Sequence, residues 1–211
     1  MTIELTPLAG LTVIHPNVFA DERGFFMEVY RQDQLRAEGI DAQFVQCSHS
    51  SSKAGILRGL HFQWDKPLGK LIRVIRGRAY VVAVDIRKKS STLGQWFGIE
   101  LSYENKKELW APPGFASGFC MVNEDAPTSG RSDGWSDSVQ TSESASIEHR
   151  GGADVEYQYT AIYNPKGESN IIWNDPAIGI EWPIEHPILS PRDGGAGTLA
   201  DWLARSESDL L

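Results

Sequence analysis

The chain has 211 residues, of which 41% are hydrophobic and 23% charged, a composition that is ordinary for a soluble globular protein. Its net charge of −8 argues against a nucleic-acid-binding surface, which needs clustered Lys and Arg side chains. No apolar run approaches the ~20 residues of a membrane span, and no signal peptide opens the chain. Two cysteines are too few for a disulfide framework, so we expect a cytoplasmic protein. From its charge and its short apolar runs, we expect it to bind neither nucleic acid nor membrane.

Short strands dominate the first part of the chain. Each expected strand is rich in apolar and β-branched residues, and Gly, Pro, Asn or Ser separates it from the next. The expected strands lie at residues 10–19, 25–31, 42–50, 55–63, 70–77, 78–87, 96–102 and 107–113.

The strand expected at residues 78–87, "RAYVVAVDIR", alternates between two faces. One face takes the even-numbered residues from Tyr80 to Ile86, and the other takes the odd-numbered residues from Val81 to Arg87. After the next expected strand, "SYENKKEL" at residues 102–109 has the composition of a hairpin turn.

Helices are few in this sequence. We expect one short helix at "RQDQLRAEG", residues 31–39, and one near "TLADWLARS", residues 198–206. The second could pack Leu199, Trp202 and Leu203 on the strand domain or on a partner subunit. Many closely spaced strands with few helices predict an all-β sandwich, jelly roll or barrel.

Residues 127–154 interrupt the strand pattern. The segment is rich in Ser, Gly and Asp and has almost no apolar periodicity. A long segment of this kind within a compact domain is either a functional lid or a disordered insertion.

The strand expected at residues 55–63, "GILRGLHFQ", places a cation, Arg58, and an imidazole, His61, among apolar residues. A catalytic metal site commonly has an H-x-H pair plus a third ligand, but His61 is followed by Phe-Gln, so we expect no metal. The sequence also has no phosphate-binding P-loop, no dinucleotide fingerprint and no G-x-S-x-G motif. Acid–base chemistry on an anionic substrate remains, with His61 as the base.

Further downstream, tyrosines at 157, 159 and 163 and the carboxylate of Asp175 are candidates for the acid and for a group that orients the imidazole. The structural alternative is that the tyrosines only lie at the rim of a strand domain and that Asp175 forms an Asx turn before Pro176. Spacing alone does not decide between these two interpretations.

Ordered motifs along most of the chain make the sequence resemble one known family. The segments "FADERGFFMEVY", "GILRGLHFQ", "GKLIRVIRG", "VAVDIRKKSSTLGQW", "PPGFASGF", "YNPKGESNIIWNDPAIGIEWP" and "LSPRD" are similar to those of dTDP-4-dehydrorhamnose 3,5-epimerases. The resemblance covers about residues 1–193, interrupted by 127–154, and leaves 194–211 as a tail or helix. It implies an all-β, cupin-like double-stranded β-helix or jelly roll with short peripheral helices, a homodimer, and no metal or organic cofactor.

The resemblance also implies roles in catalysis. It makes His61 the general base that removes a proton next to the sugar's C4 ketone, and Tyr157 the acid that returns a proton on the other face. Asp175 of "WNDP" is then the carboxylate that pairs with His61. An enolate needs a preorganised positive or donor group, and the resemblance assigns this role to Lys70.

For substrate binding, the resemblance implies contacts along the whole sugar nucleotide. Guanidinium groups suit the pyrophosphate, polar side chains the nucleoside, and an aromatic ring the thymine base. The implied binding residues are Arg23 and Arg58 (pyrophosphate), Glu28 and Gln46 (nucleoside), Tyr163 (thymine), and Glu168, Ser48 and Ser117 (further contacts).

Four positions depart from the pattern of the family. Ser117 stands where the family usually has a second histidine, and Ser48 where it has an asparagine. Val81 replaces an aspartate that would lie near Lys70, and Gln158 replaces a lysine. These changes raise the question of whether the preferred sugar, or the number of inverted centres, is different here.

We therefore expect an enzyme that inverts C3 and C5 of dTDP-4-dehydro-6-deoxy-glucose, a dTDP-4-keto-6-deoxyhexose, in rhamnose-type deoxysugar biosynthesis. A single-centre epimerase acting at C3 or C5 of another 4-keto sugar nucleotide is the first alternative, motivated by Ser117 and the insertion. A non-catalytic sugar-nucleotide-binding protein is the second.

Overall fold

The computed structural model describes residues 1–121 and 152–211. Most of the segment singled out at 127–154 lies outside the described residues, so its role as a lid or a disordered insertion stays open. Its last two residues, 153 and 154, belong to a regular strand and are therefore not part of any irregular segment.

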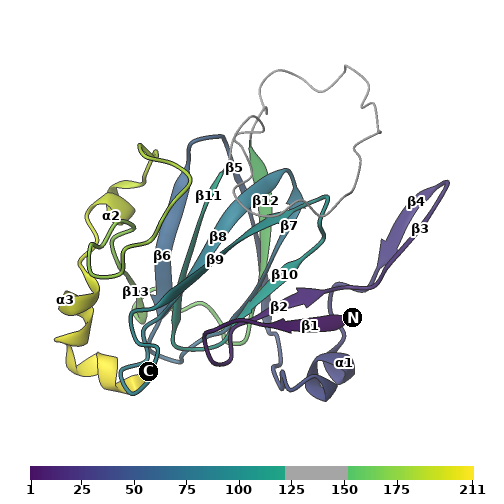
Figure 1. Ribbon diagram of the computed structural model, residues 1–211. Helices are drawn as coiled ribbons and strands as arrows, with labels where there is room; N and C mark the ends of the chain where they lie inside the picture. The colour runs from purple at the N-terminus through teal and green to yellow at the C-terminus, as the bar shows by residue number, and fades with distance from the viewer. Residues whose placement is uncertain (122–151) are drawn as a thin grey trace.

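A six-stranded antiparallel sheet forms one wall of the molecule (Figure 1). Its strand order is β1-β2-β10-β7-β12-β5, so strands distant in sequence are neighbours in space. Its strands are β1 (Thr2–Leu5), β2 (Thr12–His15), β5 (Gln46–Ser52), β7 (Lys70–Arg76), β10 (Glu108–Ala111) and β12 (Ala153–Tyr159).

A five-stranded antiparallel sheet with the order β13-β6-β11-β8-β9 forms the opposite wall. Its strands are β6 (Leu57–Gln63), β8 (Arg78–Asp85), β9 (Trp96–Ser102), β11 (Phe115–Met121) and β13 (Glu168–Asn170). Two facing antiparallel sheets with such non-sequential strand orders make a jelly roll, which confirms the expected all-β class.

Apolar side chains from both sheets fill the space between them. Val13, Leu109 and Val155 of the six-stranded sheet share one cluster with Val81 and Ala83 of the five-stranded sheet, and all are fully buried. The odd-numbered face expected for residues 78–87 therefore points inward at these positions.

The even-numbered face of β8 points away from this interior and is covered by the C-terminal part of the chain (Figure 1). Leu199 and Trp202 are buried against Phe62 and Val84. The expected helix thus packs on its own chain. The C-terminal helices are α2 (Pro191–Gly194), α3 (Leu199–Leu203) and a 3₁₀ helix (Ser206–Leu210).

The helix expected at residues 31–39 is present as α1 (Gln32–Ala37). Its Leu35 packs with Ile14 and Trp110 on the outer face of the six-stranded sheet. In the described ranges, no helix is long and apolar enough to be a candidate for crossing a membrane.

Strands β3 (Val18–Asp21) and β4 (Gly24–Met27) form a separate hairpin that extends away from both sheets (Figure 1). Several of its large apolar side chains are exposed, including Phe19 and Phe26 at 62% and 65%. Such a surface is unusual for an isolated monomer.

The turn expected at residues 102–109 does not join a hairpin. Strand β9 before it pairs with β8, whereas β10 after it pairs with β2 and β7 of the other sheet. The turn composition was correct, but the composition of a turn does not determine which sheet the next strand joins.

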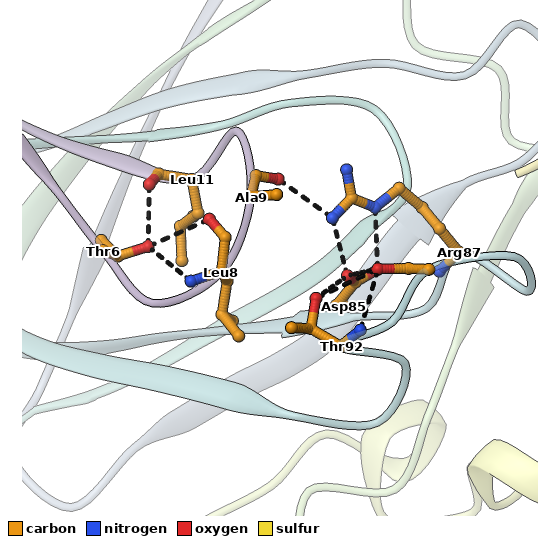
Figure 2. A network of polar contacts seen from close by, with 8 residues as sticks. Thr6, Leu8, Ala9, Leu11, Asp85, Arg87 and Thr92 are labelled. Carbon is orange, nitrogen blue, oxygen red and sulfur yellow. Dashed lines mark hydrogen bonds and ion pairs between the residues drawn. The ribbon is translucent and has the colours of Figure 1, made fainter.

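A buried polar network ties the end of β8 to the turn between β1 and β2 (Figure 2). The Asp85 carboxylate accepts hydrogen bonds from Arg87 (Nη2, 2.6 Å), Ser90 (Oγ, 2.6 Å) and Thr92 (Oγ1, 2.6 Å), and Arg87 also donates to the carbonyl of Ala9 at 3.0 Å. Burial alone would raise the pKa of Asp85, but these donors outweigh it and lower the pKa to about 2. The network therefore holds an ionised carboxylate that is 0% exposed.

Candidate active site

A cavity of about 260 Å³ lies between the two sheets. The five-stranded sheet contributes His61 and Ser117 to its wall, and the six-stranded sheet contributes Lys70 and Tyr157. The expected base and the expected acid therefore lie on opposite walls of one cavity.

Arg58 and His61 both border this cavity, although a regular strand would point residues three apart to opposite faces. The register between β6 and β11 explains the difference. His61 pairs with Ser117 and Arg58 pairs with Phe119, so two residues of β6 lie opposite one residue of β11. This bulge adds the extra residue that brings both side chains to the same side.

Glycine makes the close approach of these two strands possible at the bulge. A Cβ atom on Gly59 would lie 2.5 Å from the Cα atom of Gly118, and Gly59 has a φ of +131°. Only a residue without a side chain fits there without moving the backbone. Gly59 in "RGLHFQ" therefore allows the bulge that brings the Arg58 and His61 side chains to the same side of β6.

The imidazole of His61 is held by Asp193, a residue of α2. The distance between His61 Nε2 and Asp193 Oδ1 is 2.6 Å, and Asp193 is 3% exposed. Burial would raise the pKa of Asp193, but hydrogen bonds from His61 and Ser190 outweigh it and hold the pKa below its ordinary value. An ionised carboxylate thus faces Nε2, which leaves Nδ1 as the nitrogen that can accept a proton.

The expectation that Asp175 pairs with His61 is wrong. The Asp175 carboxylate accepts hydrogen bonds from the backbone N–H groups of Ala177 at 2.9 Å and Leu199 at 2.6 Å. It ties the loop after "WNDP" to the start of α3, and its role is structural. The Asx-turn alternative describes the bond to Ala177.

Lys70, the first residue of β7, borders the cavity. Its ammonium donates to the His61 carbonyl at 3.0 Å and to the Ser117 hydroxyl at 2.9 Å. Burial lowers the pKa of Lys70 to about 8, although the charge of Glu168 opposes this shift. An ammonium has three N–H groups, and these two bonds leave the third unused by any described residue.

Tyr157 borders the cavity from β12, as does Tyr159. Their rings are stacked, with 6.0 Å between the ring centroids. The Tyr157 hydroxyl is hydrogen-bonded to Ser50 Oγ at 2.5 Å. Burial raises the pKa of Tyr157 to about 12, while the bond to Ser50 and the charge of Arg58 act in the opposite direction. The phenol is therefore protonated at neutral pH.

Three of the expected binding residues, Ser48, Tyr163 and Glu168, border the cavity, and Gln46 is hydrogen-bonded to two of them without bordering it. The backbone N–H of Tyr163 donates to Gln46 Oε1 at 2.9 Å, and the Tyr163 hydroxyl donates to Glu168 at 2.8 Å. Gln46 in turn donates to Ser48 Oγ at 3.3 Å. Arg192, a residue of α2, donates to the same Glu168 oxygen at 2.6 Å.

Arg23 and Glu28 lie outside this cavity. Both belong to the hairpin region, where Arg23 pairs with Asp21 and its side chain is 85% exposed, and Glu28 lies 3.6 Å from Arg31. The structure therefore does not bring these two residues to the site of their own chain.

The four departures from the family pattern separate into two groups. Ser48 and Ser117 border the cavity. Val81 instead lies in the apolar interior, and Gln158 lies between two cavity-facing tyrosines on β12, so it points to the opposite face. Only the first two departures can touch a substrate in the cavity of their own chain.

Two residues of the site were not among the expected catalytic or binding residues. Asp193 lies within the quoted "LSPRD" motif, but nothing in its local sequence links it to His61. Ser50 had a stronger signal, because Ser48, Ser50 and Ser52 occupy alternate positions that face one side of β5. Within residues 1–121 and 152–211, no three His, Cys, Asp or Glu side chains form a group that could hold a metal ion.

Comparison with known proteins matches this chain to one family. The family model described as dTDP-4-dehydrorhamnose 3,5-epimerase matches residues 5–142 and 145–201. A protein of that name from Salmonella typhimurium is 42% identical over 202 residues, which cover 94% of this chain and 96% of that protein. Another from Neisseria gonorrhoeae is 41% identical over 201 residues, or 95% of this chain; there the chain spans only 53% of the relative's length.

Among solved structures, one similar protein is a dTDP-6-deoxy-D-glucose-3,5-epimerase from Legionella pneumophila in complex with dTDP-4-keto-L-rhamnose. It is 37% identical, has a TM-score of 0.80, and the match covers 98% of this chain and 96% of that one. The similarity therefore extends over both sheets and the C-terminal helices.

Proposed function

The chain belongs to the dTDP-4-dehydrorhamnose 3,5-epimerase family, whose members are isomerases, and we propose that it inverts C3 and C5 of dTDP-4-dehydro-6-deoxy-glucose. The observation that carries this proposal is the placement of His61 and Tyr157 on opposite walls of one cavity. An inversion needs a base on one face of the sugar ring and an acid on the other. The dTDP-4-keto sugar bound by the Legionella enzyme supports the substrate class.

In the first half of each inversion, His61 is the base. Its Nδ1 takes the proton from the carbon next to the C4 ketone, and the electron pair of the broken C–H bond forms an enolate. Asp193 stabilises the resulting imidazolium through Nε2–H and keeps the ring in place. Asp193 is thus a positioning residue.

In the second half, the enolate must be stabilised and then protonated from the other face. The free N–H of Lys70 provides a positive donor for the enolate oxygen. Tyr157 then gives its proton to the carbon, and the enolate's electron pair forms the new C–H bond. Tyr157 is left as a phenolate, so it takes a proton from solvent, while the His61 imidazolium releases its proton to solvent.

Other residues at or next to the cavity suit the pyrophosphate and the nucleoside of the substrate. Arg58 borders the cavity with a guanidinium held by Ser52 Oγ at 2.9 Å, which suits a pyrophosphate. We assign Tyr163 to the thymine ring, Gln46 to the rest of the nucleoside, and Glu168 to a further substrate contact.

Deuterium uptake tests the proposal directly. The protein is incubated with dTDP-4-dehydro-6-deoxy-glucose in D₂O, and NMR follows both the configuration and the deuterium content of C3 and C5. We expect deuterium and inversion at both carbons. Deuterium at one carbon would favour the single-centre alternative. No deuterium at either carbon would contradict both epimerase hypotheses and favour the non-catalytic sugar-nucleotide-binding protein.

The ionisation of Lys70 predicts a pH dependence. Because burial lowers the pKa of Lys70 to about 8, the ammonium is lost as pH rises through this value. The enolate then loses its cation, so kcat/KM should fall above about pH 8, as measured in initial-rate assays from pH 6 to 10. A Lys70→Arg variant keeps its charge over this range and should lose the decline, whatever its absolute rate. If its decline matches that of the wild type, another group causes it.

The proposal includes a homodimer in which the hairpin of one copy completes the site of the other. Arg23 and Glu28 lie on an extended hairpin with exposed Phe19, Phe25 and Phe26, and a second copy would cover these rings. Arg23 would then reach the cavity of the partner as a second pyrophosphate ligand.

Mixed dimers test this arrangement. Arg23→Ala and His61→Ala proteins are each expected to be poorly active, but their mixed dimer has one cavity with His61 and an intact hairpin from the partner. Co-expression should restore up to about a quarter of the wild-type activity, since about half of the dimers are mixed and each has one intact site. If Arg23 acts within its own chain, the mixture gives only the average of the two variants. Light scattering checks the dimer itself.

A further inference from the structure

The inward face of β5 carries Ser48, Ser50 and Ser52, and two of them are hydrogen-bonded to polar groups that border the cavity. Ser52 Oγ accepts from Arg58 at 2.9 Å, and Ser50 Oγ lies 2.5 Å from the Tyr157 hydroxyl. The strand register pairs Tyr157 directly with Ser48. The hydrogen bond between Tyr157 and Ser50 therefore runs diagonally, because Ser50 lies two positions further along β5. Among the described residues, the Tyr157 hydroxyl is the hydrogen-bond partner of the Ser50 hydroxyl.

The chemistry of the proposed reaction gives this hydroxyl a task. When Tyr157 gives its proton to the enolate carbon, its oxygen becomes a buried phenolate. Burial disfavours this anion, as the raised pKa of Tyr157 indicates, and a hydrogen bond to the oxygen favours it. A neighbour that donates to this oxygen therefore stabilises the transition state more than the ground state.

We propose that Ser50 is a positioning residue for the acid: its hydroxyl donates to the Tyr157 oxygen and stabilises the phenolate formed during inversion. This inference rests on the proposed function. Because Ser50 donates, the proton of Tyr157 is free to point into the cavity toward the carbon that receives it. The same hydrogen bond becomes charge-assisted when Tyr157 loses that proton.

A Ser50→Ala variant separates this role from a structural one. In D₂O, His61 can remove a proton and return a deuteron to the same face, which gives exchange without inversion. Inversion needs Tyr157 and should fall roughly 10- to 100-fold, the usual range for a lost hydrogen bond to a charged group. Deuterium uptake should fall much less, so the ratio of uptake to inversion rises.

Three further variants make the result specific. Tyr157→Phe should raise the same ratio further, and Ser50→Thr keeps a hydroxyl and should return it toward the wild-type value. Ser51→Ala makes the same change one position along, on the outer face of β5, and should leave both rates unchanged.

The proposed role for Ser50 is overturned if uptake and inversion fall in parallel in Ser50→Ala, or if neither changes. A parallel loss would identify Ser50 as a structural residue. If the wild-type protein shows neither uptake nor inversion, the proposed function itself fails, and this is visible before any variant is compared. Melting temperatures of all variants exclude unfolding as the cause.

Discussion

Replacing His61 with alanine should lower kcat about 10²- to 10⁴-fold, the scale for loss of a general base. The loss is large because His61 borders the cavity on the wall opposite Tyr157, and because Asp193 holds its imidazole in place. The measurement is the rate of inversion by NMR at saturating substrate. A His186→Ala variant, which removes an exposed imidazole outside the cavity, should retain wild-type activity.

Two carboxylate variants test which aspartate is paired with the His61 imidazole. Asp193→Asn keeps the shape of the side chain but removes its charge, so kcat should fall while the fold is retained. Asp175→Asn should instead lower the melting temperature, because this carboxylate accepts from Leu199 and Ala177, and should leave kcat per folded molecule near that of the wild type. The reverse pattern would restore the pairing of His61 with Asp175 and contradict the structure. A His61→Ala protein with undiminished turnover would exclude His61 as the base.

The largest effect on stability is expected for Asp85→Ala, a loss of about 3 kcal/mol in the free energy of unfolding. The substitution leaves Arg87 without its carboxylate partner and removes the acceptor for Ser90 and Thr92 (Figure 2). We place the loss at the lower end of the range for broken buried ion pairs, because the Arg87 side chain is 27% exposed and keeps some hydration. Urea unfolding at pH 7 measures it.

An exposed ion pair provides the control for this prediction. Asp41 pairs with Arg36, but both side chains are largely exposed, so Asp41→Ala should cost less than about 1 kcal/mol. The pH dependence gives a second check. Because the folded pKa of Asp85 is about 2, its contribution is complete above the ordinary pKa of 3.8 and is lost as pH falls through 2. A loss for Asp85→Ala no larger than that for Asp41→Ala would contradict the importance of the network.

The strands of the first half of the molecule could be predicted because their signal is local. Alternation along residues 78–87 correctly separated the interior face of Val81 and Ala83 from the face of Val82 and Val84. Both expected helices are present and each begins one residue after its expected start, and Trp202 packs as its spacing indicated. The resemblance to a family also supplied eight residues that the cavity brings together.

What local patterns could not supply was the pairing of distant residues. Asp193 is hydrogen-bonded to His61 although 132 positions separate them in the chain. Asp175 of "WNDP", the aspartate expected to pair with His61, instead accepts a hydrogen bond from the backbone of Leu199. Strands β9 and β10 are likewise consecutive in the chain, but this did not predict that they belong to different sheets. The chain passes from one sheet to the other at residues 102–109.

The sequence by itself determined the class of fold, the alternation of its strands and the residue types available for acid–base chemistry, because each depends on short-range spacing and composition. Only the tertiary structure decided which groups meet. A bulge at Gly59 turns Arg58 and His61 to the same side, and β12 inserts between β5 and β7 so that Tyr157 reaches Ser50. The physical reason is that hydrogen bonds between strands, and not neighbours along the chain, set the distances inside a closed pair of sheets.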